Sequence, residues 1–360
     1  MTTLLVPCAG RSSRFPDMRP KWLLTHPDGR LMVDKALEGC RTDRFDRIVF
    51  VIVKAHDDEF EASLILQQAF ARFGDRLHIV TLPEFTSGQA ETASLAIAAA
   101  SITGPVLIKD SDNYLAWDDK DDVTNFVVVG NLNHLRDTTN VAAKSYVALD
   151  KNNIIQDIVE KRIISGTFCA GAYQFASAQA FQDAFKDMSG NAGLEKETYV
   201  SHVIAWMMAR QGQIFRGYEA TGYEDWGTLR EWRVKQKRFS TLFCDLDGVL
   251  VKNVGQYGSR RWENSLDPIA ENLRALQTAY NSGAQIVIVT ARTEEFRPQI
   301  IALLQAHGIV PHAVLTNCHH SHRVMINDYA ATNPYPSCSA VSIPRDASLA
   351  PYLQDYIHER

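Results

Sequence analysis

The chain has 360 residues, a formal net charge of −5 at pH 7 and a hydrophobic fraction of 46%. This length predicts two domains rather than one, and the acidic balance argues against a nucleic-acid-binding surface. No apolar run reaches membrane-spanning length, residues 1–14 do not read as a secretory signal, and the six cysteines lack zinc-site or disulfide spacing, so we expect a cytoplasmic protein without membrane partners.

The first expected element is a short apolar strand at Leu4–Val6, followed by a loop of small and basic residues. Small residues allow backbone N–H groups to approach phosphates, and nearby cations suit an anionic ligand. A basic turn that binds nothing is the alternative interpretation. The candidate ligand contacts in this segment are Ala9, Gly10, Arg11, Ser12, Ser13, Arg14 and Lys21.

The spacing of this loop resembles the G-x-G-[ST]-R…P-K signature of the sugar-1-phosphate nucleotidyltransferases. The match runs from Ala9 to Arg14 and continues at Pro20-Lys21, with Ser12 where the family usually has its second glycine. The resemblance implies a doubly wound α/β domain over residues 1–232 that uses Mg2+. Such an enzyme would join a nucleoside triphosphate to a sugar or polyol phosphate and release pyrophosphate.

Alternating apolar strands and helical patterns continue the α/β interpretation along the chain. We expect core strands at Arg47–Val53 and His78–Leu82, with a helix at Asp58–Phe73 between them. Gly88 and Gln89 then precede an alanine-rich helix, and the resemblance implies that they contact the nucleotide base. An ordinary helix N-terminus is the alternative for these two residues.

An apolar strand at Val106–Ile108 is expected to end in the sequence Asp-Ser-Asp, which closes with Asp112. The resemblance implies that Asp112 binds the Mg2+ of the triphosphate and that Asp225, in the sequence EDWGT, is its second ligand. Two carboxylates from distant segments are a usual way for a protein to hold Mg2+ together with phosphates.

Glu160 and Lys161 follow another expected strand, and Gly171 opens the next one. The resemblance implies that these residues contact the acceptor, with Lys161 binding its phosphate as a point charge and Glu160 accepting hydrogen bonds from hydroxyl groups. A salt bridge at an exposed strand end is the alternative for Glu160 and Lys161. A helix at Tyr199–Arg210 is expected to serve packing.

After a charged run at residues 230–240, a strand at Thr241–Cys244 is expected to end in Asp245-Leu-Asp247. Side chains at positions i and i+2 of an extended segment share one face, so the two carboxylates can converge on one site. Two like charges there favour a bound cation or a role in proton transfer. An Asp-rich turn is the alternative interpretation.

Two further strands are expected at Gln285–Val289 and Val324–Ile326, ending in Thr290 and Asp328. Strands that deliver Asp, Thr and Asp in this order resemble the haloacid dehalogenase phosphatase superfamily. The resemblance implies a small capless, doubly wound α/β domain over residues 240–360.

In that superfamily the first Asp, here Asp245, forms an aspartyl-phosphate, and the second, here Asp247, is the general acid and base. Thr290 and Ala291 would hold the phosphoryl group, and Mg2+ would be bound by three carboxylates, Asp245, Asp247 and Asp328. The family usually places a Lys before the last acidic motif, whereas this chain offers His322 and Arg323. Either Arg323 takes that role or the phosphatase is weakened.

The resulting hypothesis is a bifunctional enzyme that makes an activated sugar, for instance for capsule or other surface polysaccharide. Three alternatives remain open. The phosphatase domain has only a structural or regulatory role, the acceptor is a polyol phosphate or phosphocholine, or the chain is a nucleotide-binding regulator without turnover. The sequence also leaves a homo-oligomer open.

Overall fold

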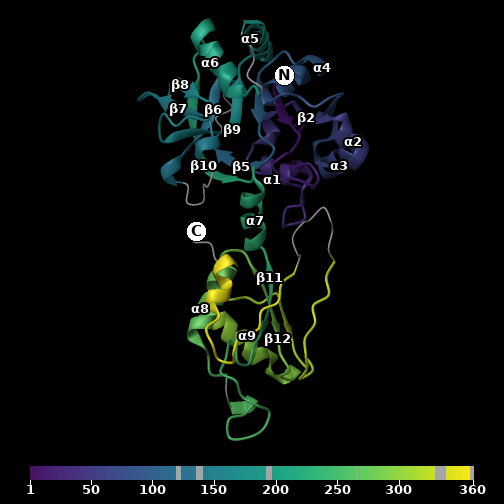
Figure 1. Cartoon of the computed structure of the whole chain (residues 1–360), viewed down its shortest axis with the longest axis vertical. Helices are drawn as coiled ribbons and strands as arrows, with labels where there is room; N and C mark the ends of the chain where they lie inside the picture. Colours follow the sequence, from purple (N-terminus) through teal and green to yellow (C-terminus); the bar gives the residue numbers. More distant parts are fainter. Residues whose placement is uncertain (119–122, 135–140, 192–196, 265, 329–337, 357–360) are drawn as a thin grey trace. The chain divides into compact units, whose positions relative to one another are not determined.

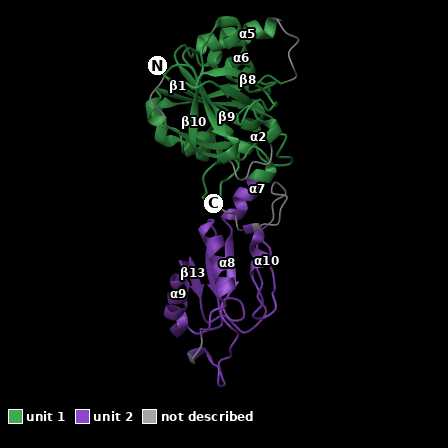
Figure 2. Ribbon diagram, turned by 90° about the vertical axis from the view of Figure 1, so that its left-hand side faces the viewer, with its two compact units in different colours: residues 1–231 green, residues 232–360 purple. Residues whose placement is uncertain are grey.

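The computed structural model describes residues 1–118, 123–134, 141–191, 197–264, 266–328 and 338–356. The chain divides into two compact units, Met1–Glu231 and Trp232–Arg360 (Figure 2). The buried hydrophobic residues form separate clusters in the two units. Each unit therefore has a hydrophobic core of its own.

In the described part of unit 1, ten strands form one sheet, whose main order is β3-β2-β1-β4-β9-β6-β10-β5. The strands β3, β2, β1 and β4 are parallel, whereas β9 runs antiparallel to both β4 and β6. Strands β7 and β8 join the sheet beside β9. The strand bounds are β1 Thr3–Pro7, β2 Arg47–Val53, β3 Leu77–Leu82, β4 Val106–Lys109, β5 Asn113–Trp117, β6 Phe126–Asn131, β7 Tyr146–Leu149, β8 Ile155–Val159, β9 Thr167–Phe175 and β10 Arg216–Asp225.

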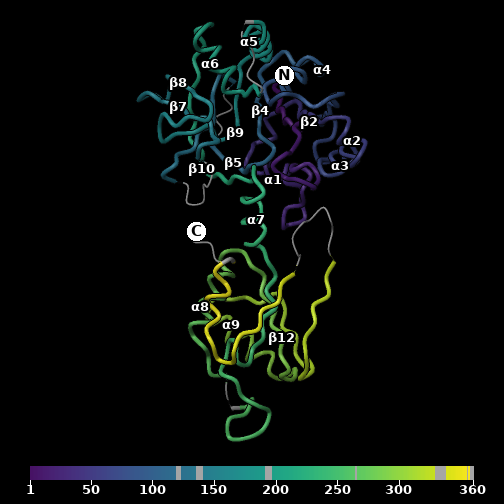
Figure 3. Tube along the Cα trace, in the orientation of Figure 1, coloured from purple at the N-terminus to yellow at the C-terminus, as the bar shows by residue number. Residues whose placement is uncertain are grey.

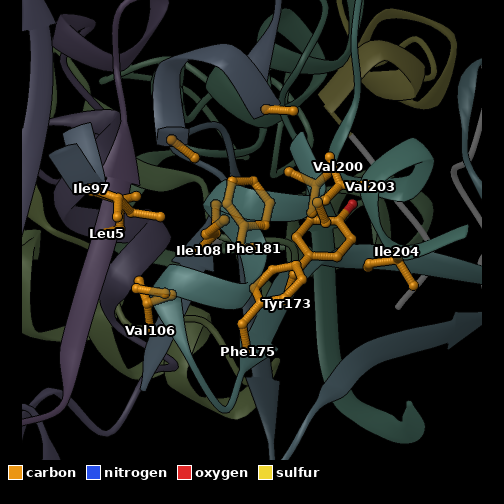
Figure 4. Packing of buried hydrophobic residues seen from close by; sticks show 14 of the residues in the cluster. Leu5, Ile97, Val106, Ile108, Tyr173, Phe175, Phe181, Val200, Val203 and Ile204 are labelled. Atoms are coloured by element: carbon orange, nitrogen blue, oxygen red, sulfur yellow. The ribbon is translucent and has the colours of Figure 1, made fainter. Parts of the chain in front are cut away.

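Helices cover both faces of this sheet because its strands present apolar side chains alternately to either side. On β1, Leu5 packs into the cluster that α4, α5 and α6 cover, whereas Leu4 and Val6 pack into the cluster of the opposite face, which α3 covers. Figure 4 shows the first cluster, in which the rings of Phe175 and Phe181 meet edge to face at 4.7 Å. The helices, labelled in Figure 1, are α1 Met32–Leu37, α2 Lys54–Phe60, α3 Ala62–Ala69, α4 Gln89–Ala99, α5 Ala178–Asn191, α6 Val200–Gln211 and α7 Leu229–Arg238.

Two expectations for this unit need correction. The helix expected at Asp58–Phe73 is broken at Glu61, whose left-handed backbone (φ 53°) ends α2 and begins α3. The strand expected at His78–Leu82 is present as β3, but it lies at the sheet edge and most of its residues are only half-buried. An edge strand has one neighbour, so fewer of its side chains are covered.

In the described part of unit 2, three parallel strands form a sheet in the order β11-β12-β13. Consecutive parallel strands joined by right-handed crossovers place both connecting helices on the same face. Accordingly, one cluster joins Cys244, Ile288 and Val314 of the three strands to residues of both α8 and α9, such as Leu276 and Ile300. The bounds are β11 Thr241–Asp245, β12 Gln285–Val289, β13 Ala313–Leu315, α8 Ala270–Asn281, α9 Arg297–Ala306 and α10 Ala350–Leu353.

The prediction of a strand at Val324–Ile326 is wrong. Residues 316–328 contain neither helix nor strand, and Ile326 is 91% exposed. The course of the chain in unit 2 can be followed in the trace of Figure 3. The preceding residue, Arg323, is held by Asp245 at the carboxyl end of β11, through an Nη1–Oδ2 distance of 2.9 Å. A strand parallel to β11 that began at Val324 would have to start at the opposite end of β11. The third strand of the sheet is instead β13.

Candidate functional site

The parallel strands β1 and β4 lie side by side, with Leu5 opposite Ile108, so the loops that follow them leave the same edge of the sheet. Polar side chains that follow the carboxyl ends of such strands form the usual ligand site of open α/β sheets. The loop after β1 carries Arg14 and Lys21, and the turn after β4 carries Asp112.

The loop after β1 is fixed by Ser12, whose backbone is left-handed (φ 51°). The hydroxyl of Ser12 accepts the backbone N–H of Lys21 at 3.1 Å, and its carbonyl accepts that of Phe15 at 2.8 Å. A Cβ added to Gly10 would meet no described atom within 4 Å, so this backbone faces open space. Of the other loop residues, Ala9 is buried, Ser13 is exposed, and the guanidinium of Arg11 lies over the Phe85 ring at 4.5 Å.

The carboxylates of Asp112 and Asp225 flank one point beside Gly227. A Cβ added to Gly227 would lie 3.0 Å from Asp112 Oδ2 and 3.1 Å from Asp225 Oδ1, and 3.7 Å from Nη1 of Arg14. The backbone makes this arrangement because β5 and β10 pair with Asn113 opposite Asp225, and Trp226 donates its N–H to the carbonyl of Asp112 at 3.0 Å. Two residues 113 positions apart in the sequence are thus held together by the sheet.

A lysine accompanies each of these carboxylates. The ammonium of Lys21 forms an ion pair with Asp112 Oδ2, and that of Lys144 lies 2.6 Å from Asp225 Oδ2. Although burial opposes it, the charges of Lys21 and Arg14 lower the pKa of Asp112. Asp112 therefore remains a carboxylate that can ligate a cation.

A third carboxylate, that of Asp110, belongs to the same turn after β4 as Asp112. Burial, and then the negative charge of Asp112, raise the pKa of Asp110 to about 6. Its Oδ1 accepts a hydrogen bond from the Gln89 amide at the start of α4, and a Cβ on Gly171 would lie 2.5 Å from its Oδ2. The backbone of Gly171 is left-handed (φ 93°), so glycine is required there for both space and conformation.

Two of the three residues expected to bind the acceptor, Glu160 and Lys161, follow β8 and contact residues at the start of α6, whereas the third, Gly171, lies within β9. The Lys161 ammonium donates to the Tyr199 hydroxyl and lies over its ring at 4.3 Å. Glu160 Oε2 accepts the Ser201 hydroxyl at 2.6 Å and also that of Ser145. Through these contacts Lys161 and Glu160 lie side by side, next to the first residues of α6.

Gly88 and Gln89, the residues expected to bind the base, also lie near the start of α6. A Cβ added to Gly88 would lie 2.9 Å from the backbone nitrogen of Thr198, and Ala90 donates its N–H to the Thr198 carbonyl at 3.2 Å. The segment that precedes α6 therefore packs directly on the start of α4, where Gln89 lies. Any side chain at position 88 would push the two segments apart.

The donor set around Gly227 fits a hard divalent cation such as Mg2+, which prefers carboxylate oxygens. Within the described residues, no three His, Cys, Asp or Glu side chains come close enough to hold a metal ion by themselves. A cation held by Asp112 and Asp225 would therefore complete its coordination with oxygens of phosphate or water, which is how Mg2+ is commonly bound.

In unit 2, the two carboxylates that follow β11 are each engaged by an arginine. Asp245 accepts Arg323 Nη1 at 2.9 Å, and Asp247 accepts Arg292 Nη2 at 2.7 Å and Nε at 3.0 Å. Arg292 is fully buried, and its backbone N–H donates to the Thr290 hydroxyl at 3.1 Å. The guanidinium of Arg292 thus fixes the orientation of Asp247.

The expected three-carboxylate metal site of unit 2 is not assembled among the described residues, because Asp328 is not grouped with Asp245 and Asp247. The cause is the missing strand at residues 324–326, which was expected to carry Asp328 to the carboxyl end of β11. Thr290 itself is buried at the end of β12, beside the half-buried Ala291.

Sequence reasoning missed three residues of these sites. Asp110 is the first residue of the Asp-Ser-Asp turn, and Arg292 is a charged residue three positions after the end of β12, so both had a signal in the sequence. Lys144 gave no signal, because nothing in the sequence AAKSY connects it with Asp225, 81 positions away. None of the described helices has the length and apolar character needed to cross a membrane.

Comparison with known proteins identifies solved structures with a similar fold but does not assign the chain to a family. No protein-family model and no curated protein matches the chain. A nucleoside-diphosphate-sugar pyrophosphorylase from Vibrio cholerae RC9 shares its fold with 17% sequence identity and a TM-score of 0.55, over 65% of this chain and 99% of that one. That share of the chain corresponds in size to Met1–Glu231.

Two other solved structures are similar. A Bacillus anthracis protein assigned as a glucose-1-phosphate thymidylyltransferase has 15% identity and a TM-score of 0.52, over 66% of this chain and 94% of that one. A UDP-glucose pyrophosphorylase complexed with UDP-glucose has 14% identity and a TM-score of 0.50, over 66% and 97%. At these identities the likeness shows the fold alone, and it confirms the α/β architecture expected for the first unit.

Proposed function

We propose that unit 1 is a nucleotidyltransferase that joins a nucleoside triphosphate to a sugar phosphate and releases pyrophosphate. The observation that carries this proposal is the meeting of Asp112 and Asp225 beside Gly227, with Arg14 and Lys21 next to them, at the carboxyl edge of the sheet. The fold shared with sugar-nucleotide pyrophosphorylases supports it.

On the donor side, the open backbone at Gly10 and the cations of Arg14 and Lys21 would bind the triphosphate. Asp112 and Asp225 would hold Mg2+, which, when bound, neutralises negative charge on the phosphates. Catalysis would then consist mainly of positioning and charge neutralisation, as is general for phosphoryl and nucleotidyl transfer.

On the acceptor side, Lys161 would bind the phosphate of the sugar and Glu160 would accept hydrogen bonds from its hydroxyl groups. An oxygen of the acceptor phosphate attacks the α-phosphorus and forms the new P–O bond. The bond from the α-phosphorus to the bridging oxygen breaks, and pyrophosphate leaves with that electron pair. A polyol phosphate or phosphocholine would present the same phosphate to Lys161, so the acceptor remains to be identified.

The test is pyrophosphate release by the purified chain with Mg2+, for the four nucleotides CTP, UTP, GTP and dTTP and a panel of sugar phosphates, polyol phosphates and phosphocholine. We expect release with one nucleotide and one acceptor, and a loss of at least about 100-fold in kcat for Asp112→Asn, because one ligand charge is removed. Asp183→Asn is the matched control, since Asp183 is an exposed residue of α5 whose Oδ1 accepts a hydrogen bond from the Gln179 amide at 2.7 Å.

Full activity of Asp112→Asn would refute the proposed site. Nucleotide binding without pyrophosphate from any acceptor would instead favour a regulator without turnover.

We also propose, as a second function, that unit 2 hydrolyses a phosphomonoester through Asp245. This rests on the pairing of Arg323 with Asp245, which puts a cation where the nucleophile and a phosphate would need it. A carboxylate oxygen of Asp245 would attack the phosphorus and the P–O ester bond would break, with Asp247 giving a proton to the leaving alcohol oxygen. Water would then attack the phosphorus of the acyl-phosphate, give a proton back to Asp247 and release orthophosphate. Within the described residues Asp328 is not grouped with Asp245 and Asp247, so a Mg2+ bound in unit 2 would be held by two carboxylates together with phosphate oxygens, as proposed for unit 1.

Orthophosphate release from sugar bisphosphates tests this second function. We expect Asp245→Asn to abolish it while pyrophosphate release continues, with Asp267→Asn, a change at an exposed position of unit 2, as the control. Orthophosphate that persists in Asp245→Asn would contradict the nucleophile, and its absence from the unaltered chain across the panel would leave unit 2 a structural or regulatory role.

A further inference from the structure

Lys144 is an unusually enclosed lysine. Its side chain is 8% exposed, and its ammonium lies 4.9 Å from the centre of the Phe168 ring and 5.0 Å from that of the Tyr223 ring, two rings that meet edge to face. It donates to the Tyr223 hydroxyl at 2.7 Å and to Asp225 Oδ2 at 2.6 Å. Rings, hydroxyl and carboxylate together hold the ammonium in one position.

The two carboxylate oxygens of Asp225 have different partners. Oδ2 accepts both Lys144 and, at 3.1 Å, the Tyr223 hydroxyl. Oδ1 faces the point beside Gly227 that Asp112 also flanks, and it accepts the N–H of Gly227 at 2.9 Å. Oδ2 therefore accepts two side-chain donors, whereas Oδ1 accepts one backbone donor and is directed at the cation site.

The other carboxylate has a less enclosed lysine. Lys21 pairs with Asp112 Oδ2, the oxygen that faces the same point, and 19% of its side chain is exposed. Its partner oxygen is thus itself a prospective cation ligand, so Lys21 and a cation compete for it. A triphosphate would offer Lys21 a new partner nearby.

We infer that, in the ligand-free chain, Lys21 and Lys144 neutralise the two carboxylates, so that a divalent cation binds between them only together with a triphosphate. Lys21 would then exchange Asp112 for the phosphates, whereas Lys144 stays on Asp225 Oδ2 as a positioning residue. This inference rests on the proposed nucleotidyltransferase function of unit 1.

The physical reason is repulsion between like charges at short range. An ammonium a few ångströms from a divalent cation opposes its binding, and low exposure to water weakens the screening of that repulsion. A triphosphate brings negative charge that offsets both ammonium groups. The cation is then favoured only in its presence.

A second contact ties Lys144 to the acceptor side. Its carbonyl oxygen accepts the backbone N–H of Lys161 at 3.1 Å, and Lys161 has a left-handed backbone (φ 52°). A left-handed non-glycine residue persists where its surroundings hold it. Lys144 thus positions a cation ligand with its side chain and the acceptor-binding lysine with its backbone.

The test measures binding of Mn2+, a spectroscopic stand-in for Mg2+, by electron paramagnetic resonance of the full chain. The unaltered chain should bind Mn2+ weakly alone and at least about tenfold more tightly with a non-hydrolysable triphosphate analogue. Lys144→Met, which keeps the stem but removes the charge, should bind Mn2+ alone at least about fivefold more tightly than the unaltered chain.

Lys144→Arg, which keeps a charge, should stay closer to the unaltered chain than Lys144→Met does, and Lys186→Met, at an exposed position of α5, should change nothing. Adding Asp225→Asn to Lys144→Met should remove the gain, which locates the bound Mn2+. Thermal melting of each variant checks that it is folded.

Unchanged Mn2+ affinity in a folded Lys144→Met variant would overturn the inference, as would a gain that survives Asp225→Asn. The Mn2+ measurements require no turnover, so failure of the inference can be told apart from failure of the proposed function. Absence of pyrophosphate with every nucleotide would remove that function, yet the affinity for Mn2+ alone would still decide whether Lys144 opposes the cation.

Discussion

At the scale of single residues, His56 shows how burial alone controls a titration in unit 1. Its side chain is 6% exposed, its ring meets that of Phe85 at 5.1 Å, and its Nδ1 has no hydrogen-bond partner within the described residues. Burial lowers the pKa of His56 below the ordinary value of 6.5. The folded protein therefore favours the neutral imidazole.

This predicts a pH dependence of stability with a definite sign. Below about pH 6.5 the unfolded chain binds a proton at His56 that the folded chain resists, so stability is lost as the pH falls. Between pH 7 and pH 5 the midpoint of thermal unfolding should drop less in His56→Gln than in the unaltered chain, by about 2 °C or more. His134→Gln, at an exposed position, is the control; equal drops in all three proteins would contradict the prediction.

At the scale of elements, a bulge in β9 shapes the floor of the site. The pairing of β9 with β6 shifts register between Val127 and Val129, opposite the segment that contains Gly171. A bulge bends its strand and often lies next to a functional site. Here it lets the β9 backbone approach the side chains of Asp110 and Asn113.

Gly171→Ala should therefore be strongly destabilising. The new Cβ would overlap the Asp110 carboxylate and the Asn113 amide, and it would strain a left-handed backbone, which together should cost about 2–4 kcal/mol of unfolding free energy. Urea unfolding measures this loss. Gly190→Ala, at a position in α5 where a Cβ meets no described atom within 4 Å, should be neutral or slightly stabilising; a similarly small effect at Gly171 would refute the argument.

At the scale of the whole molecule, the sequence indicated many of the residues of the site, but it did not indicate the long-range contacts between them. Asp112 and Asp225 were named through a resemblance of motifs, and the sheet brings them together. Lys144 could not be named, because its role depends on which strands pair and on rings that are distant in the sequence. Contacts of this kind are fixed by tertiary structure, and neither periodicity nor spacing reveals them.

The same limit explains the wrong strand in unit 2. The run Val324–Ile326 is apolar and reads locally as a strand. Its placement depends on a long-range contact, the pairing of Arg323 with Asp245, which is not encoded in the local pattern. The strands that do form, β11 and β12, lie where they were predicted. Cys244 of β11 and Ile286 and Ile288 of β12 pack into one cluster with residues of α8 and α9.

The left-handed Ser12 has a consequence for the energetics of ligand binding. A serine pays conformational energy for this backbone where glycine would not, yet its hydroxyl closes the loop onto Lys21. The loop is therefore ordered before any phosphate arrives, and less conformational entropy is lost on binding than a freely moving glycine loop would lose. The backbone strain at Ser12 in the ligand-free protein should therefore be offset by tighter binding of the phosphate ligand.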